Sequence, residues 1–147
     1  ATAIYAGLSV NDLMNLELAY SPQFGSAKDA INHAGYVGNN VMENKSPNVH
    51  WNQLDSELDR GVKVLDVRTQ AEFERGHIPG AILAPVDELR DRLDDLVGEE
   101  YVVHCAVGQR AHTAIQILKS KGIRASNLSG GYTTWKFGQD ALERASV

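Results

Sequence analysis

The chain contains a single cysteine, Cys105, which is followed by a short segment that ends in an arginine. The segment comes directly after an apolar run and consists of Ala106, Val107, Gly108, Gln109 and Arg110. If this backbone curls around the sulfur and enters a helix, several N–H groups point at the sulfur and the helix dipole adds positive potential. Such a loop stabilises a thiolate, the nucleophilic form of cysteine. We therefore expect Cys105 to be a catalytic nucleophile and residues 106–110 to form its anion-binding loop.

Two residues of this segment have properties that suit such a loop. Gly108 has no Cβ and so tolerates a sharp turn, and Arg110 offers a permanent charge in a planar fork. A lone cysteine at a strand end is more often a buried structural residue. The composition of the loop favours the reactive cysteine over that alternative.

Composition limits the classes of protein to which the chain belongs. Its 147 residues have a formal net charge of -5, with 43% hydrophobic and 22% charged residues, which is typical of a globular protein and unfavourable for nucleic-acid binding. No apolar run approaches the roughly 20 residues that cross a bilayer, and a single cysteine excludes an internal disulfide. We expect a cytoplasmic protein that binds no nucleic acid, membrane or metal.

The chain falls into two parts of different character. Residues 1–46 show helical stretches without a strand pattern, and a stripe of small and apolar residues there is expected to pack against another helix or subunit: Ala27, Ile31, Ala34, Gly38 and Val41. Residues 43–48 are polar and contain a proline, which is typical of a linker. We predict one domain over residues 1–46 and a second over residues 47–147.

Short strand patterns alternate with amphipathic helices in the second part. We expect strands at residues 62–67, 81–83 and 101–104, and helices at residues 70–75, 86–96 and 110–119. This alternation predicts an α/β fold, a parallel β-sheet flanked by helices on both faces. Ligand sites in such folds lie at the carboxyl ends of the strands, where Cys105 emerges.

Three motifs in this part resemble the signatures of rhodanese domains. They are Leu65-Asp66-Val67-Arg68-Thr69 with Gly76-His77-Ile78-Pro79-Gly80-Ala81, the loop Cys105 to Ala111, and Leu128-Ser129-Gly130-Gly131-Tyr132 with Trp135. The resemblance covers about residues 48–144 and implies a rhodanese-like fold and a sulfurtransferase activity. In this family the cysteine takes a sulfane sulfur from thiosulfate, a polysulfide or a persulfide, and passes it from a cysteine persulfide to a thiol acceptor. Arg110 would then either clamp an anion or anchor the loop.

Loop length distinguishes sulfur transfer from phosphate chemistry in this comparison. Four residues separate Cys105 from Arg110, as in sulfurtransferases, whereas the related cell-cycle phosphatases and arsenate reductases have five. The loop interior also carries no additional cation, unlike rhodaneses that are specialised for thiosulfate. We therefore expect a sulfurtransferase, and the loop composition disfavours thiosulfate among the three candidate donors.

Several other polar residues are interpreted as structural. Asp66, Arg68 and Glu72 are expected to form a buried ion-pair network, and His104 should point away from the side chain of Cys105 because it precedes it on a strand. No two histidines have the spacing of metal ligands, so no metal site is predicted.

The first part resembles the end of the dimerisation domain of pyridine nucleotide-disulfide oxidoreductases, above all coenzyme A-disulfide reductases fused to a rhodanese domain. The motifs are residues 18–24, which contain Tyr20 and Pro22, and residues 27–36. The resemblance implies that this chain is the tail of such a fusion, and that Tyr20 reaches the reductase site only in the parent enzyme. It also implies FAD, NAD(P)H and CoA as ligands of a homodimeric parent, and none of these cofactors in this fragment. The alternative is a non-catalytic docking or dimerisation module of the parent flavoenzyme.

Overall fold

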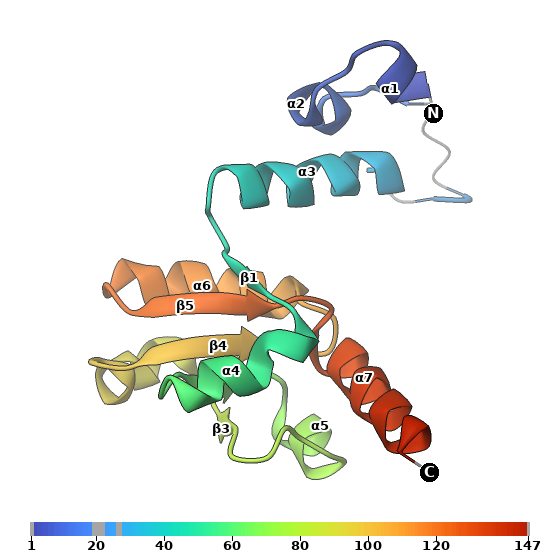
Figure 1. The fold of residues 1–147 in the computed structure, drawn as a ribbon. Coiled ribbons are helices and arrows are strands. Elements are labelled where there is room, and N and C mark those ends of the chain that lie inside the picture. The colour runs from blue at the N-terminus through green and yellow to red at the C-terminus, as the bar shows by residue number, and fades with distance from the viewer. Residues whose placement is uncertain (1, 19–22, 26–27, 147) are drawn as a thin grey trace. The chain divides into compact units, whose positions relative to one another are not determined.

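The computed structural model describes residues 2–18, 23–25 and 28–146, and the chain divides into two compact units (Figure 1). The units are Ala1–Lys45 and Ser46–Val147, so the division falls one residue before the boundary expected from the sequence. The origin of the first unit in a reductase stays a prediction.

The described part of the first unit contains three helices, α1 (Thr2–Tyr5), α2 (Val10–Met14) and α3 (Ala30–Met42). Ser9 is the N-cap residue of α2 and Asp29 that of α3, and each of these side chains accepts a hydrogen bond from a backbone N–H of the first turn. Because only α3 exceeds three turns, the unit depends on the packing of α3 against α2.

Helix α3 contacts α2 through a face that the sequence stripe located only in part: a Cβ at Gly38, a member of the stripe, would come 3.0 Å from the side chain of Val10 in α2. Gly35 lies so close to α2 that an added Cβ would come 2.7 Å from the backbone nitrogen of Met14, and the buried Asn32 amide donates to the carbonyl oxygens of Leu13 and Leu16. Ala34 and Val41, which we expected in the contact, are exposed, and Ala27 lies outside the described residues. The contact therefore combines Gly38 of the stripe with a polar anchor, Asn32, that the apolar pattern did not indicate.

The second unit is built on a five-stranded parallel sheet. Its strands are β1 (Asn48–Val49), β2 (Lys63–Asp66), β3 (Ile82–Leu83), β4 (Glu100–His104) and β5 (Arg124–Leu128), in the order β1-β5-β4-β2-β3. Strand β4 therefore occupies the centre of the sheet. This arrangement confirms the predicted α/β class with a parallel sheet.

Helices cover both faces of this sheet (Figure 1). They are η1 (Trp51–Gln53), α4 (Leu54–Asp59), α5 (Gln70–Glu74), η2 (Leu89–Leu96), α6 (Gln109–Ser120) and α7 (Gly131–Ala145). Alternate residues of the central strands point to opposite faces: Val103 packs in the core with α6 and η2, whereas Val102 packs in a second core with α4 and α7. Both faces of β4 are buried, which gives the strand that precedes Cys105 a rigid position.

Segment 86–96 differs from the helix expected there. The structure has a 3₁₀ helix, η2, that starts only at Leu89 after a turn from Pro85 to Glu88. Leu89, Leu93 and Leu96 are buried as the pattern required, because apolar residues three or four positions apart share a face in either kind of helix. The hydrophobic spacing therefore predicted the buried face correctly and the type of helix incorrectly.

Candidate active site

Cys105 lies at the carboxyl end of the central strand β4. The residue is only 1% exposed, and its backbone leaves the sheet immediately after His104. The thiol is thus held at a fixed point beside the loop that leads into α6. The site is where the topology of the sheet predicted it.

The backbone of the loop donates directly to the sulfur. The N–H of Gly108 lies 3.1 Å from Sγ of Cys105, and Gly108 is also the N-cap residue of the twelve-residue helix α6. Its φ of 107° lies in the left-handed region, which glycine adopts without steric cost. The sulfur therefore receives a backbone N–H at the positive end of a helix dipole, and both features stabilise negative charge on it.

Two carbonyl groups of the loop accept hydrogen bonds from the start of α7. The backbone N–H of Tyr132 donates to the carbonyl oxygen of Cys105 at 2.8 Å, and that of Thr133 donates to Ala106 at 3.1 Å. In a trans peptide the C=O and the following N–H point in opposite directions. The N–H groups of Ala106 and Val107 are therefore directed away from α7, which leaves them available on the opposite side of the loop.

Gly131 makes this approach of α7 possible. A Cβ at this position would lie 2.5 Å from the carbonyl oxygen of Cys105 and 2.6 Å from that of Ala106, far inside van der Waals contact. Its φ of 61° again lies in the left-handed region. A glycine is thus required here for two independent reasons.

A third support of the loop is the side chain of Asn127 on β5, which the sequence reading did not identify. Its Nδ2 donates to the carbonyl oxygen of Gly108 at 3.1 Å, and the same oxygen accepts the first backbone bond of α6 from His112. Asn127 is buried at 9% exposure. Its position as the fourth residue of a different strand gave no local signal of a role in the loop.

Arg110 forms a two-pronged ion pair with Glu72 at the start of α5. Its Nη1 and Nη2 donate to Oε2 and Oε1 of Glu72, both at 2.7 Å. The Arg110 guanidinium, together with hydrogen bonds from Thr69, lowers the pKa of the Glu72 carboxyl to about 2. Glu72 in turn raises the pKa of Arg110, with a smaller contribution from the Cys105 sulfur. A guanidinium so engaged favours the role of a loop anchor over that of an anion clamp.

A separate buried network lies beneath the loop. Asp66 accepts from the backbone N–H of Arg68 at 3.0 Å and from its guanidinium at 2.6 Å, and the Arg68 guanidinium stacks over the ring of Tyr132 at 4.2 Å. Asp66 and Arg68 thus form the expected buried ion pair, whereas Glu72 pairs with Arg110 outside that network. The network supports Tyr132, whose backbone N–H holds Cys105.

His104 is fully buried within the same network. Burial lowers the pKa of its imidazole to about 4, so the ring is neutral at physiological pH. Its Nδ1 lies 3.4 Å from the carbonyl oxygen of Cys105 and its Nε2 lies 3.6 Å from Oδ2 of Asp66. The ring therefore faces backbone and carboxylate oxygens, in agreement with its expected orientation away from the thiol.

The remaining predicted site residues differ in their accessibility. Val107 and Gln109 are exposed on the loop surface, and Ala106 is partly buried. Tyr20, expected to serve only in a parent reductase, lies outside the described residues. The catalytic role of Cys105 and its loop stays a prediction that this geometry makes chemically reasonable.

Within the described ranges, no three His, Cys, Asp or Glu side chains come together as metal ligands. No helix in those ranges has the length and apolar character to span a bilayer. The cytoplasmic location and the lack of a metal stay predictions.

A parallel α/β sheet that delivers one cysteine into an N–H-lined loop at a helix N-terminus defines a domain built for thiolate chemistry. The profile of the rhodanese-like domain family matches residues 50–137, and the chain belongs to that family. The match includes Cys105, the whole loop, and the supporting residues Glu72, Asn127 and Gly131.

Solved structures and curated proteins similar to this chain include sulfur-handling enzymes. Reduced CoADR-RHD of Bacillus anthracis is 38% identical with a TM-score of 0.88, over 97% of this chain and 26% of that one. An NAD-dependent persulfide reductase from A. fulgidus is 34% identical with a TM-score of 0.78, over 91% of this chain and 24% of that one. Human thiosulfate:glutathione sulfurtransferase is 33% identical over 107 residues, which are 61% of this chain and 93% of that protein.

The lengths of these matches limit what they imply. The chain spans about a quarter of the two bacterial and archaeal chains, and less than half of the first curated relatives that it matches. The family and the relatives support a rhodanese-type sulfurtransferase activity, while the larger context of the domain is a matter for proposal.

Proposed function

We propose that this domain is a sulfurtransferase in which Cys105 accepts a sulfane sulfur and passes it to a thiol. The observation that carries the proposal is the 3.1 Å hydrogen bond from the Gly108 N–H to Sγ at the N-terminus of α6. The same N–H and helix dipole that stabilise a thiolate also stabilise an anionic persulfide one sulfur longer. Neither half-reaction then leaves negative charge without a partner.

The reaction consists of two balanced displacements. In the first, the Cys105 thiolate attacks the sulfane sulfur of the donor, a new S–S bond forms, and the remainder of the donor leaves with the electron pair of the broken bond. In the second, an acceptor thiolate attacks the outer sulfur of the Cys105 persulfide, and Cys105 leaves as a thiolate. The cysteine returns to its starting state without any external oxidant or reductant.

The charges of the loop favour a persulfide over thiosulfate as donor. Arg110 is the only cation between residues 106 and 110, and its guanidinium already binds both carboxylate oxygens of Glu72. A thiosulfate dianion would therefore find backbone N–H groups but no unengaged cation within the loop. A donor that carries less charge places a smaller demand on this site.

The larger context that we propose is a parent flavoenzyme, an FAD- and NAD(P)H-dependent disulfide or polysulfide reductase. The match to CoADR-RHD extends over 97% of this chain and thus into the first unit, whereas the match to the human sulfurtransferase spans 61%. Such a parent would be a homodimer in which Tyr20 contributes to the reductase site and CoA serves as a thiol substrate. The chain itself lacks a Gly-x-Gly-x-x-Gly dinucleotide motif, so FAD and NAD(P)H would bind elsewhere in the parent.

Intact-mass measurement after treatment with polysulfide tests the sulfurtransferase proposal. The wild-type chain is expected to gain one sulfur atom that a reductant removes, and Cys105→Ser is expected to gain none. Transfer of the added sulfur to an acceptor thiol then completes the cycle. The absence of any gain, or an equal gain in Cys105→Ser, would overturn the proposal.

A docking or dimerisation module is the second candidate function, and one observation favours it. Helix α3 presents Val37, Val41 and Met42 at 62%, 52% and 75% exposure, more apolar surface than a short helix normally leaves in water. Sedimentation of the full chain and of its Val41→Asp variant measures whether the chain self-associates and whether Val41 is needed for it. Self-association that the substitution abolishes supports it, and a monomer in both cases contradicts it.

A further inference from the structure

Arg68 is a buried arginine whose guanidinium contacts several elements of the second unit at once. Its side chain is 5% exposed, and Nε and Nη2 donate to the carboxylate of Asp66 at 3.0 and 2.6 Å. Nη2 also donates to the carbonyl oxygen of Gly76 at 2.8 Å, and the guanidinium carbon lies 4.2 Å from the centre of the Tyr132 ring. One planar group therefore joins the end of β2, the turn after α5 and the start of α7.

The ion pair with Asp66 accounts for only part of this arrangement. A buried guanidinium requires a partner of opposite charge, and the fully buried Asp66 supplies it. The bond to Gly76 uses an N–H at the edge of the group, and the contact with Tyr132 uses its flat face. A Cβ at Gly76 would lie 2.6 Å from the hydroxyl oxygen of Tyr132, so the ring and the turn also lie against each other. The contacts therefore depend on the planar shape of arginine as well as on its charge.

The contact with Tyr132 leads to the start of the catalytic loop. The backbone N–H of Tyr132 donates to the carbonyl oxygen of Cys105, and that of Thr133 donates to Ala106. Because ring and N–H belong to one residue, a guanidinium that fixes the ring also fixes the donor. The Cys105 side chain packs in the core that contains α6, whereas the Tyr132 ring packs against the other core. This support therefore reaches the loop from the face of the sheet opposite the thiol.

The bond to Gly76 leads to the end of the loop. Gly76 follows α5 after one intervening residue, and its N–H donates to the carbonyl oxygen of Phe73 in that helix at 3.1 Å. Glu72 precedes Phe73 and binds Arg110, the last residue of the loop, through two hydrogen bonds. The hydrogen bonds from both ends of the loop therefore lead back to Arg68.

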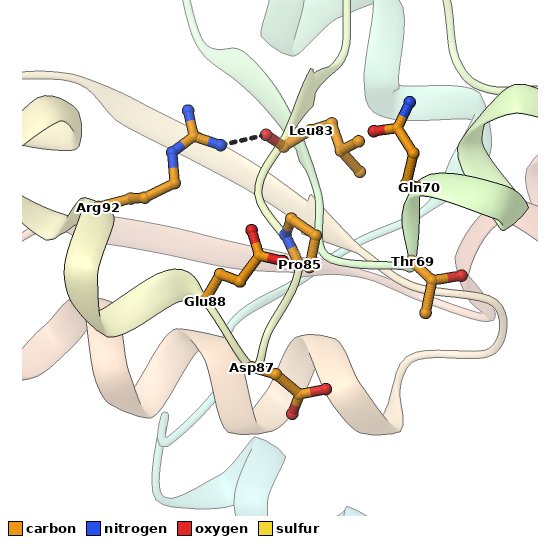
Figure 2. Close-up of a pocket in the computed structure, with 7 residues that line it drawn as sticks. All are labelled: Thr69, Gln70, Leu83, Pro85, Asp87, Glu88 and Arg92. Atoms are coloured by element: carbon orange, nitrogen blue, oxygen red, sulfur yellow. Dashed lines mark hydrogen bonds between the residues drawn. The ribbon is translucent and has the colours of Figure 1, made fainter.

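Helix α5 has little packing of its own to keep Glu72 in place. None of its residues, Gln70–Glu74, is buried, and its start borders a cavity of about 350 Å³ with Thr69 and Gln70 in the wall (Figure 2). A helix of five residues is too short to be stable through its own hydrogen bonds. Its position therefore depends on fixed contacts at its ends, and the bond between Arg68 and Gly76 supplies one of them.

We propose that Arg68 is a positioning residue for sulfur transfer, which holds both ends of the catalytic loop through Tyr132 and Gly76. The inference rests on the proposed function and adds what keeps the Gly108 N–H directed at the sulfur. Donors held in one orientation stabilise developing negative charge, whereas donors that must reorganise stabilise it less. Arg68 acts on Cys105 only through the residues that it holds.

Arg68→Lys in the full chain tests the proposal. Lysine retains a positive charge opposite Asp66 but lacks the planar face and the fork of N–H groups. Reaction of Cys105 with iodoacetamide is the probe, because it reports the reactivity of the thiolate without any sulfur donor. At fixed pH the rate is expected to fall about fivefold, as for the loss of one cation–π contact. The pH profile of the reaction is also expected to move to higher pH, which a loss of stability alone would not cause in the folded protein.

Tyr132 variants determine whether Arg68 acts through the ring, and they keep the ion pair between Arg68 and Asp66. Tyr132→Leu is expected to slow alkylation as Arg68→Lys does, and Tyr132→Phe is expected to restore the rate because it presents the same face to the guanidinium. Added to Tyr132→Leu, the Arg68→Lys substitution should slow the reaction by only about twofold, since only the path through Gly76 remains. The same fivefold effect in both backgrounds would overturn the coupling.

Trp51→Leu is the matched control. The ring of Trp51 packs on α7 further from the loop, where a Cβ at Gly138 would lie 2.5 Å from it. This variant is expected to lose stability and to keep the wild-type alkylation rate. Equal slowing in Trp51→Leu, or wild-type alkylation in Arg68→Lys, would overturn the role of Arg68. Failure of polysulfide to load Cys105 in the wild type would instead overturn the proposed function, so the two failures are distinguishable.

Discussion

Arg110 and Glu72 are 38 positions apart in the sequence, yet the guanidinium of one binds both carboxylate oxygens of the other. The pair joins the first turn of α6 to the first turn of α5, and so fixes the end of the catalytic loop from outside it. Glu72 additionally caps α5 together with Thr69. Loop shape therefore depends on a residue that never touches the sulfur.

Replacement of Glu72 by Gln is expected to weaken this anchor. The amide retains one acceptor but loses the charge and the second hydrogen bond to Arg110. Since both side chains are partly exposed, at 26% and 35%, the expected loss of unfolding free energy is about 1 kcal/mol. Denaturant unfolding measures this loss, and sulfur transfer should slow severalfold. Glu74→Gln, on the same helix but without a contact to Arg110, is the control, and equal effects of both would contradict the anchor.

Acid should remove the contribution of Glu72 within a defined pH range. The pKa of Glu72 falls from 4.5 to about 2 in the folded state, so the unfolded chain binds the proton at a higher pH than the folded chain. The stabilisation is therefore complete above about pH 4.5 and is lost as the pH falls towards 2. The difference in unfolding free energy between wild type and Glu72→Gln is expected to shrink over this range. A difference that stays constant from pH 6 to about pH 2.5 would refute the assignment.

His104 predicts a second pH dependence at higher pH. Burial lowers the pKa of its imidazole from 6.5 to about 4, so between these values the unfolded chain binds a proton that the folded chain does not. Stability contributed in this way is complete above about pH 6.5 and is lost as the pH falls towards 4. His104→Asn should flatten the slope of unfolding free energy against pH in this range. An unchanged slope would mean that other groups cause it.

The sequence alone predicted the position of the loop better than the residues that support it. Cys105, Gly108 and Arg110 lie within six consecutive residues, so their spacing and the strand before them indicated the place of the loop and the edge of the sheet. Glu72 was assigned to the wrong ion pair because two acceptable basic partners, Arg68 and Arg110, occur in the sequence. Only the folded sheet shows that Asp66 already satisfies Arg68.

Short elements and side-chain supports escaped prediction for a similar reason. Strand β1 has two residues and gains its pairing only from β5, so no periodicity marks it. Asn127 follows a weak strand pattern, and its amide gains a role only when β5 lies beside β4 under the loop. Long-range hydrogen bonds of this kind leave no local signal in a sequence.

Asn127 is expected to position the loop through the carbonyl group of Gly108. Asn127→Asp keeps the shape but replaces the Nδ2 donor with an oxygen that faces the Gly108 carbonyl oxygen at 3.1 Å. The lost hydrogen bond and the new repulsion should cost about 1 to 3 kcal/mol of unfolding free energy. Alkylation of Cys105 at fixed pH should also slow, because the Gly108 N–H is displaced from the sulfur.

A structural role alone would not alter alkylation of the folded protein, so this rate is the decisive measurement for Asn127. Ser126→Ala is the control, since Ser126 is the neighbour of Asn127 on β5. Among the hydrogen bonds of the described residues, none joins the Ser126 side chain to the loop. Alkylation at the wild-type rate in Asn127→Asp, with stability reduced, would show that the residue supports the fold only.

Gly131→Ala is expected to separate the helix α7 from the catalytic loop. The new Cβ would lie 2.5 Å from the carbonyl oxygen of Cys105 and 2.6 Å from that of Ala106, so either α7 or the loop must shift. The shift would break the hydrogen bonds from Tyr132 and Thr133 that fix the orientation of these two peptide groups. Polysulfide loading of Cys105 should fall at least tenfold, since the loop N–H groups lose their orientation towards the developing charge.

Gly122→Ala provides a matched control for the strain that any side chain suffers at a positive φ. Gly122 has a φ of 72°, close to the 61° of Gly131, but no atom lies within 4 Å of the position of its Cβ. Backbone strain should therefore cost each variant about 1 kcal/mol of unfolding free energy. Gly131→Ala should lose additional stability because of the clash with the loop, and of the two variants it alone should show the slower sulfur loading. Equal stability and equal loading in the two variants would mean that the close approach of α7 does not control the loop, because strain is then the only effect of either substitution.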